Sequence, residues 1–192
     1  MPRQGARPGQ SILQTPAAGA AGRAALPSGR LGFQRLPAFA MPLPELILRP
    51  AVEADLPFLL DLRRRTMEPH LRQDGVPFDE AAHMRRIRYH WEDARIVLID
   101  QAPTGLFKVR HDEAGWYVIQ IQVDPARQGQ GLGARLLRGV LARADEGGEA
   151  TRLYVLKGNP ARRLYERLGF AIQEETDIEF LMRRPPRGGT AA

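Results

Sequence analysis

A strand pattern, a glycine-rich turn and a helix pattern follow one another in the middle of the chain. The alternating apolar run at 116–123 predicts a strand, which ends at Asp124. Three glycines then stand at every second position over 129–133, where an amphipathic helical pattern begins. Glycines let backbone N–H groups approach an anion, and a helix N-terminus offers unpaired donors with a partial positive charge. No acidic residue falls between Asp124 and Asp145, so the segment predicts a site for a phosphate-bearing cofactor.

The glycine spacing by itself also fits other ligands. Gly129, Gly131 and Ala134 satisfy the G-x-G-x-x-A fingerprint of dinucleotide-binding folds. Such folds need an acidic residue about 20 positions further on and alternating strands and helices, and this sequence offers neither. A helix start that binds nothing is the other alternative, although three bare glycines there would cost stability without a functional reason.

Two signatures in register resemble those of the GNAT N-acetyltransferase superfamily. Residues 128–133, Gln-Gly-Gln-Gly-Leu-Gly, are similar to its Q/R-x-x-G-x-G/A loop. Residues 159–170, Asn-Pro-Ala-Arg-Arg-Leu-Tyr-Glu-Arg-Leu-Gly-Phe, resemble its N-x-x-A-x-x-L-Y-x-x-x-G-F signature. The opening strand and helix at 46–56 also fit, so the resemblance covers 46–183.

The resemblance implies an α/β fold with a mixed sheet, in the order βααβββαβαββ, whose central strands splay around the cofactor. From residue patterns, we expect strands at 46–49, 96–99, 105–110, 116–123, 153–156, 170–173 and 178–182. We expect helices at 53–67, 79–92 and 132–144, a connection at 68–77, and a short helix with Asn159 as its cap and Pro160 at its first position.

The implied activity is direct transfer of an acetyl group from acetyl-CoA, the co-substrate, to a primary amine of a small molecule or peptide. Tyr165 is the expected general acid for the leaving thiolate, and an aromatic residue that only packs against the sheet is the alternative. The residues expected to contact the cofactor are Ile121, Gln122, Val123, Gln128, Gly129, Gln130, Gly131, Leu132, Gly133, Ala134 and Asn159.

Two positions depart from the family pattern. Tyr165 lies six residues after Asn159, one fewer than usual. The strand that carries a glutamate base in many members has Gln120 and Gln122 instead, and glutamine cannot accept a proton at neutral pH. The missing glutamate supports an alternative function, a catalytically silent sensor that binds acetyl-CoA.

The acceptor is expected near the first two helices and the closing strands. Gln120, His70 and Tyr89 are the predicted substrate-binding residues. Further polar candidates in that region, for each of which a solvated surface position is the alternative, are Glu68, Arg86, Glu175, Asp177 and Glu179.

Composition and charge limit the possible domain organisation. The chain has 192 residues, no cysteine and a net charge of +6, of which the five arginines and no acidic residue of segment 1–44 supply +5. That segment is interpreted as a disordered basic tail, a targeting peptide or sequence upstream of a true start at Met41. We expect one acetyltransferase domain at 45–184 and a flexible tail at 185–192.

We also expect a cytoplasmic protein without a metal site, a nucleic-acid partner or a membrane partner, and the sequence is compatible with a homodimer. An RNA-associated protein that binds through the basic tail is an alternative, but the sequence lacks a recognisable RNA-binding motif.

Overall fold

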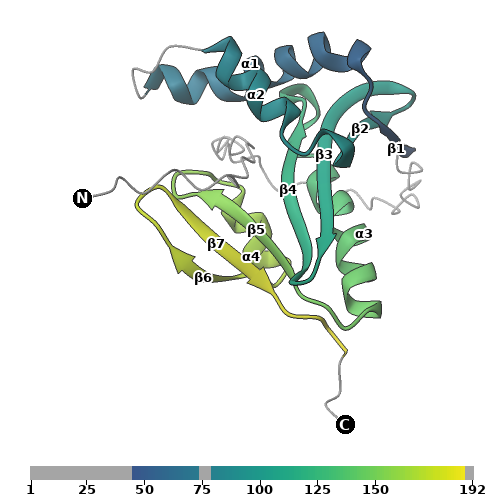
Figure 1. Cartoon of the computed structure of the whole chain (residues 1–192), viewed down its shortest axis with the longest axis vertical. Coiled ribbons are helices and arrows are strands. Elements are labelled where there is room, and N and C mark those ends of the chain that lie inside the picture. The colour runs from purple at the N-terminus through teal and green to yellow at the C-terminus, as the bar shows by residue number, and fades with distance from the viewer. Residues whose placement is uncertain (1–44, 74–78, 189–192) are drawn as a thin grey trace, which may run out of the picture.

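The computed structural model describes residues 45–73 and 79–188, with only the backbone of 68–73. The described chain forms one mixed sheet with helices on both faces (Figure 1). Its strands are β1 (Leu46–Pro50), β2 (Ala94–Ile99), β3 (Ala102–Asp112), β4 (Gly115–Val123), β5 (Thr151–Leu156), β6 (Ala171–Glu175) and β7 (Glu179–Arg184). Its helices are α1 (Leu56–Gln73), α2 (Glu80–Arg88), α3 (Leu132–Glu146) and α4 (Arg162–Arg167), with short 3₁₀ turns η1 (Glu53–Asp55), η2 (Trp91–Asp93) and η3 (Pro125–Arg127).

The predicted order βααβββαβαββ and the α/β class are confirmed. The sheet has seven strands in the order β1-β2-β3-β4-β5-β7-β6, and β4 with β5 is its parallel pair among antiparallel neighbours. In that part of the chain, no helix is both long enough and apolar enough to cross a membrane.

The parallel pair is joined over a short length. Trp116, Tyr117 and Val118 of β4 pair with the first half of β5, and the register ends there. Figure 1 shows the two strands diverging from that contact, which opens a gap in the middle of the sheet. The expected splay is therefore present in the fold.

A bulge in β4 coincides with the start of the divergence. Lys108 on β3 pairs with Gln120 and Val109 pairs with Val118, so Ile119 is one extra residue on β4. A bulge bends its strand and increases the local twist. It therefore turns the second half of β4 away from β5.

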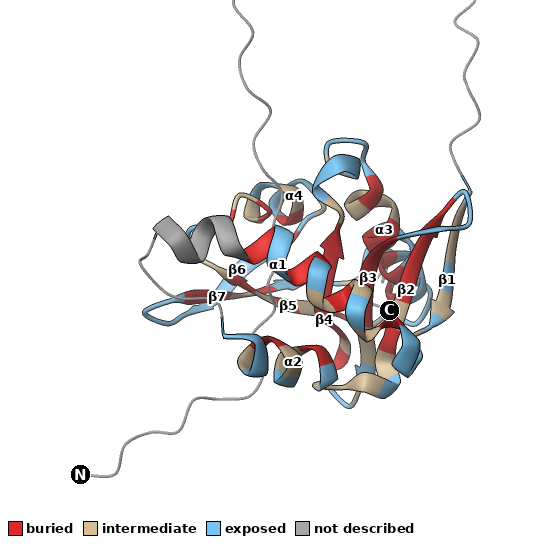
Figure 2. Ribbon diagram, turned by 90° about the horizontal axis from the view of Figure 1, so that it is seen from above, coloured by how far each residue is buried: buried red, intermediate tan, exposed pale blue. Residues whose placement is uncertain are grey.

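The helices cover the two faces of the sheet with different side chains. The α3 and α4 helices lie on one face and α2 on the other (Figure 2). Below α3 and α4 the buried side chains are almost all apolar, and Leu137, Ile121 and Leu153 are fully buried there. A second apolar cluster joins α1 and α2 to β2 and β3. The core is thus continuous on the α3 face, whereas on the α1/α2 face it covers the sheet only up to β3.

Several predicted boundaries were wrong, each for a local reason. The first helix continues to Gln73, so the connection predicted from residue 68 is partly helical. The second helix ends at Arg88 rather than residue 92, because Lys108 takes up carbonyl groups at its C-terminus. The last helix starts at Arg162 and not at Pro160, since Asn159 instead accepts a hydrogen bond from the Ala161 N–H (2.9 Å) and caps the preceding turn.

Residues 1–44, whose interpretation as a tail is a prediction, lie outside the described residues. The domain limits 45–184 likewise stay a prediction. Just beyond them, the Arg187 N–H donates to Asp145 Oδ1 (2.6 Å) at the end of α3.

Candidate active site

The edge of β4 that faces the gap offers backbone hydrogen-bonding groups. The Asp124 N–H bonds to Thr104 on the β3 side, and in a strand alternate residues direct their backbone groups to the same side. Ile121 and Val123 therefore direct theirs into the gap. The Val123 carbonyl accepts a hydrogen bond from the Gln128 side chain (2.9 Å), while Gln122 pairs with Leu106 on β3. Of the three predicted contacts on β4, Ile121 and Val123 offer their backbone to a ligand in the gap and Gln122 does not.

The glycine-rich loop follows directly. Gly129 and Gly131 have φ values of 76° and 77°, a left-handed conformation in which a side chain is strained. The first N–H to bond back along α3 is that of Arg135, to the Gly131 carbonyl (3.0 Å). The N–H groups of Leu132, Gly133 and Ala134 thus have no acceptor within the helix and form a set of donors at its positive end.

The third glycine has a packing role. A Cβ atom at Gly133 would lie 3.3 Å from Leu164 of α4 and 3.9 Å from Ile121 of β4. Its missing side chain lets the start of α3 sit against both elements, and Gly129, Gly131 and Gly133 therefore differ in function. Arg65 of α1 pairs with Asp124 (2.7 Å) at the entrance to the loop and connects the loop to the other face of the sheet.

The two residues of the second signature are buried with unused polar atoms. Tyr165 is fully buried in the apolar core, and its ring meets Phe170 edge-on. Burial raises the pKa of Tyr165, so the phenol stays protonated at neutral pH. Its hydroxyl and the Asn159 Nδ2 have no hydrogen-bond partner in the protein. An unsatisfied buried polar group costs about 1–3 kcal/mol, so a ligand that accepts these hydrogen bonds would be stabilised there.

The glutamines of β4 lie on the opposite face and are part of a polar chain. Gln120 donates to Gln122 Oε1 (2.8 Å), and Gln122 donates to Thr66 Oγ1 of α1 (3.0 Å). Both glutamines are about 1% exposed, and the Gln120 Oε1 atom has no partner. Gln120 therefore has a carbonyl oxygen available for a ligand, whereas Gln122 is occupied within the protein, and the substrate-binding role of Gln120 stays a prediction.

Three cations lie close to this polar chain, two of them (Arg63 and Lys108) buried and the third (Arg86) half-buried. Arg63 of α1, Arg86 of α2 and Lys108 of β3 form what we call the buried cation cluster. Burial, followed by the repulsion of Arg86 and Arg63, lowers the pKa of Lys108 to about 7. Burial and then Arg86 lower the pKa of Arg63 to about 10, and burial also lowers the pKa of Arg86. Placing three cations together without a neutralising anion reduces the stability of the fold. The cluster is therefore best explained by a function.

Lys108 has structural partners, but the two arginines keep unused donors. The Lys108 ammonium donates to the carbonyls of Ile87 (2.5 Å) and Tyr89 (2.7 Å), where the end of α2 carries a partial negative charge. Arg63 Nε donates to His83 Nδ1 (3.1 Å), and Arg86 donates to the Ile119 carbonyl (3.3 Å). The Nη1 of Arg63 and the Nε of Arg86 are buried without a partner.

One carboxylate faces the cluster without pairing with it. Glu179 is the first residue of β7, opposite Leu156 at the end of β5, and is only 8% exposed. Burial raises its pKa more than the charge of Arg86 lowers it, and its Oε2 atom has no partner. A raised pKa makes Glu179 a better proton acceptor than an ordinary glutamate.

Of the predicted acceptor residues, Tyr89 ends α2, with the Arg86 guanidinium 5.2 Å from its ring centre. The side chain of His70 lies outside the described residues. Sequence reasoning missed Arg63 and Lys108, and Glu179 was only one of several surface candidates. A signal was available for Lys108, which interrupts the apolar run at 106–109.

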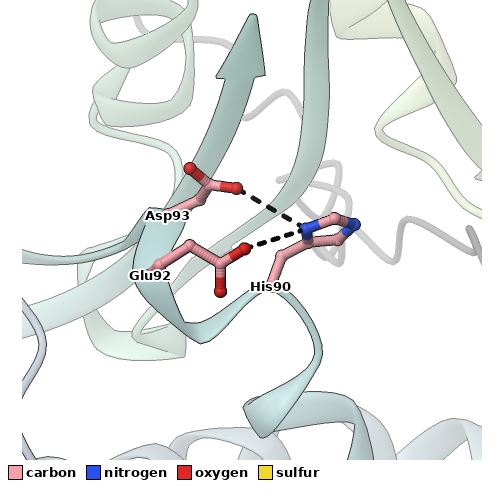
Figure 3. Close-up of side chains that lie close together, drawn as sticks. All are labelled: His90, Glu92 and Asp93. Atoms are coloured by element: carbon pink, nitrogen blue, oxygen red, sulfur yellow. Dashed lines mark hydrogen bonds and ion pairs between the residues drawn. The ribbon is translucent and has the colours of Figure 1, made fainter. Parts of the chain in front are cut away.

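Another polar group, near the end of α2, already contains an arginine. His90, Glu92 and Asp93 gather their ligand atoms within 4.8 Å of one another (Figure 3). Arg110, however, donates to His90 Nδ1 (2.6 Å) and lies 3.8 Å from Glu92 and 3.9 Å from Asp93. A guanidinium thus already supplies the positive charge that these carboxylates need.

A hollow on the α3 face, about 360 Å³ in volume, is lined by residues that include Phe107, Trp116 and Val140. None of the candidate site residues lines it. The site is therefore defined by the gap, the glycine loop and the polar face rather than by this hollow.

Comparison with known proteins agrees with this arrangement. A model of the acetyltransferase (GNAT) family matches residues 58–170, more than half of the chain. The chain therefore belongs to the GNAT family of acetyltransferases.

A mycothiol acetyltransferase of Actinosynnema mirum is 30% identical over 148 residues, which are 73% of this chain and 50% of that protein. The chain thus spans about half the length of this curated relative.

Solved structures share the fold at low sequence identity. An acetyltransferase from Thermus thermophilus superposes with a TM-score of 0.60 at 19% identity, covering 74% of this chain and 98% of that one. The PaiA N-acetyltransferase from Thermoplasma acidophilum, solved in complex with coenzyme A, gives 0.58 at 18% identity, covering 73% and 99%.

Proposed function

We propose that this protein transfers the acetyl group of acetyl-CoA directly to a primary amine of a small molecule or peptide. The observation that carries the proposal is the continuity of the gap with the glycine loop. The backbone of Ile121 and Val123 would bind the pantetheine arm and the thioester, and the free N–H groups at the start of α3 would bind the pyrophosphate. Membership in the GNAT family supports this assignment.

The chemistry needs a neutral amine and a stabilised leaving thiolate. An ammonium acceptor loses one proton to become the neutral amine, and Glu179, whose pKa is raised, is suited to take that proton. The amine nitrogen then attacks the thioester carbon, the C–S bond breaks, and the second proton, lost as the amide forms, passes to the leaving thiolate. Glu179 would replace the strand glutamate, whose position is occupied by glutamine here.

Tyr165 would stabilise the leaving sulfur. Its buried hydroxyl has no protein partner and can donate to a thiolate in a site from which water is excluded. Because burial raises its pKa, the phenol is a weak acid, and a strong hydrogen bond to the developing charge is a larger part of its contribution than complete proton transfer.

Calorimetric titration of the full chain with acetyl-CoA and with NADPH, followed by thiol release with a panel of amines, tests the proposal. Binding of acetyl-CoA alone, with thiol released by at least one amine, is the expected result. Binding without release by any amine would instead support the sensor function. Absence of acetyl-CoA binding would overturn both.

A further inference from the structure

We propose that the acceptor is zwitterionic, a small amine that also carries a carboxylate, with the carboxylate bound by Arg63 and Arg86 and the ammonium by Glu179. This inference rests on the proposed function and specifies the substrate class of the same site.

The first argument is the charge balance of the buried cation cluster. Across 45–67 and 79–188, where side chains are described, no carboxylate lies within ion-pair distance of Arg63, Arg86 or Lys108. Arg63 is 2% exposed and Lys108 is fully buried, so water cannot screen their charges. A bound anion would remove the repulsion that the cluster now carries.

The second argument is the set of unused donors. The Lys108 ammonium is held by two carbonyls, so the free capacity belongs to Arg63 Nη1 and Arg86 Nε. Guanidinium groups bind carboxylates with short, charge-assisted hydrogen bonds that match their planar geometry. Guanidinium geometry matches carboxylate and phosphate alike, so the test includes a phosphorylated amine to separate the two anions.

The third argument is position. Arg86 donates to the carbonyl of Ile119, the bulge residue that follows the last β4–β5 pair at Val118. It therefore lies where the gap begins, on the α1/α2 face, whereas the start of α3 packs against the other face of β4. An anion bound by Arg86 is thus on the acceptor side and is distinct from the cofactor phosphates.

The fourth argument is the arrangement of opposite charges. Arg86 and Glu179 are close enough to influence each other's pKa, but Glu179 keeps a raised pKa and an unpartnered oxygen. An internal ion pair would have lowered that pKa. A site with separate cationic and anionic groups complements a molecule with both charges, and it would deliver the ammonium to the group that removes its proton.

The test measures acetyl transfer by the full chain to three matched forms of each acceptor: a free amino acid, its carboxamide, and the amine that lacks the carboxyl group. A phosphorylated amine is the fourth probe. We expect the free amino acid to have a KM at least 10-fold lower than those of the carboxamide and the plain amine. Equal or better use of the carboxamide or the plain amine, both of which lack only the carboxylate, or preference for the phosphorylated amine, would overturn the inference.

Variants of α2 provide the second measurement. Arg86→Gln should raise the KM for the amino acid about 10- to 100-fold with little change for the plain amine, and Arg86→Lys should restore part of the loss. Arg85→Gln, on the exposed side of the same helix, is the matched control and should change neither value. Equal losses for both acceptors in Arg86→Gln and Arg86→Lys would contradict the proposal. Loss of acetyl-CoA binding, measured separately, would indicate failure of the proposed function instead.

Discussion

The two faces of the sheet around β4 differ in what fills them. Below α3 and α4, the buried side chains, such as Ile121 and Leu137, are mostly apolar, and the Tyr165 hydroxyl is one of a few isolated polar atoms there without a partner. On the α1/α2 face, Arg63, Lys108 and both glutamines are equally buried, and unused donors or acceptors remain on Arg63, Arg86 and Gln120. The first face has the composition expected of a stable core. The second reduces stability and is therefore best explained by a ligand.

The largest expected effect tests whether the α3 face is a structural core. Leu137→Ala should lower the free energy of unfolding by about 3 kcal/mol, because it removes a fully buried side chain and leaves a cavity. Chemical denaturation measures this value, and Glu146→Ala at the exposed end of α3 is the control. The acceptor preference should stay unchanged, and a changed preference would contradict the division between the two faces.

The next largest effect is expected at Tyr165, whose hydroxyl is an unpaired polar group on that face. Tyr165→Phe should reduce kcat about 100-fold, because the donor to the leaving sulfur is lost. The free energy of unfolding should stay equal or rise slightly, since the hydroxyl has no partner to lose. Acetyl-CoA affinity should be retained, and Tyr154→Phe is the control. Unchanged turnover would show that Tyr165 only packs in the core.

A smaller effect is expected at the loop. Gly131→Ala should weaken acetyl-CoA binding about 10-fold, because a side chain at φ 77° is strained by about 1–2 kcal/mol and distorts the donor loop. Gly139→Ala, in the interior of α3 with open space around it, is the matched control and should raise stability by about 0.5–1 kcal/mol. Equal acetyl-CoA affinity in both variants would argue against a cofactor loop.

The smallest effect at neutral pH involves His83 on the polar face. Burial, and then Arg63, lower its pKa from 6.5 to about 4. The unfolded chain binds a proton near pH 6.5 while the folded protein does so only near pH 4, so stability should fall as the pH drops between these values and stay constant above them.

Denaturation at pH 7 and pH 5 measures this dependence on His83. His83→Gln keeps an acceptor for Arg63 and should make stability less dependent on pH in that range. His111→Gln, at an exposed site, should leave the dependence as it is. An unchanged profile in His83→Gln would show that the polar face is more hydrated than its burial indicates.

The comparison also separates what could be predicted from what could not. The order of elements was predictable, because it follows from local spacing and from a family resemblance carried by contiguous residues, and the site roles of the glycine loop and Tyr165 stay predictions of the same origin. The acceptor side was predicted poorly. Arg63, Arg86 and Lys108 are far apart in sequence and resemble surface cations there. They meet only because α1 packs against β3, β4 and α2, and α2 bonds to Lys108 and Ile119.

The sequence by itself determined the strands, the helices and the loop, since these depend on periodicity, backbone preferences and residues that are neighbours along the chain. Only the tertiary structure decided that β4 leaves β5 after Val118, that Tyr165 is buried with a free hydroxyl, and that Arg63, Arg86 and Lys108 come together on one face of the sheet. The physical reason is that burial and charge proximity belong to the folded arrangement as a whole, and no local pattern encodes the pKa of a lysine or a glutamate.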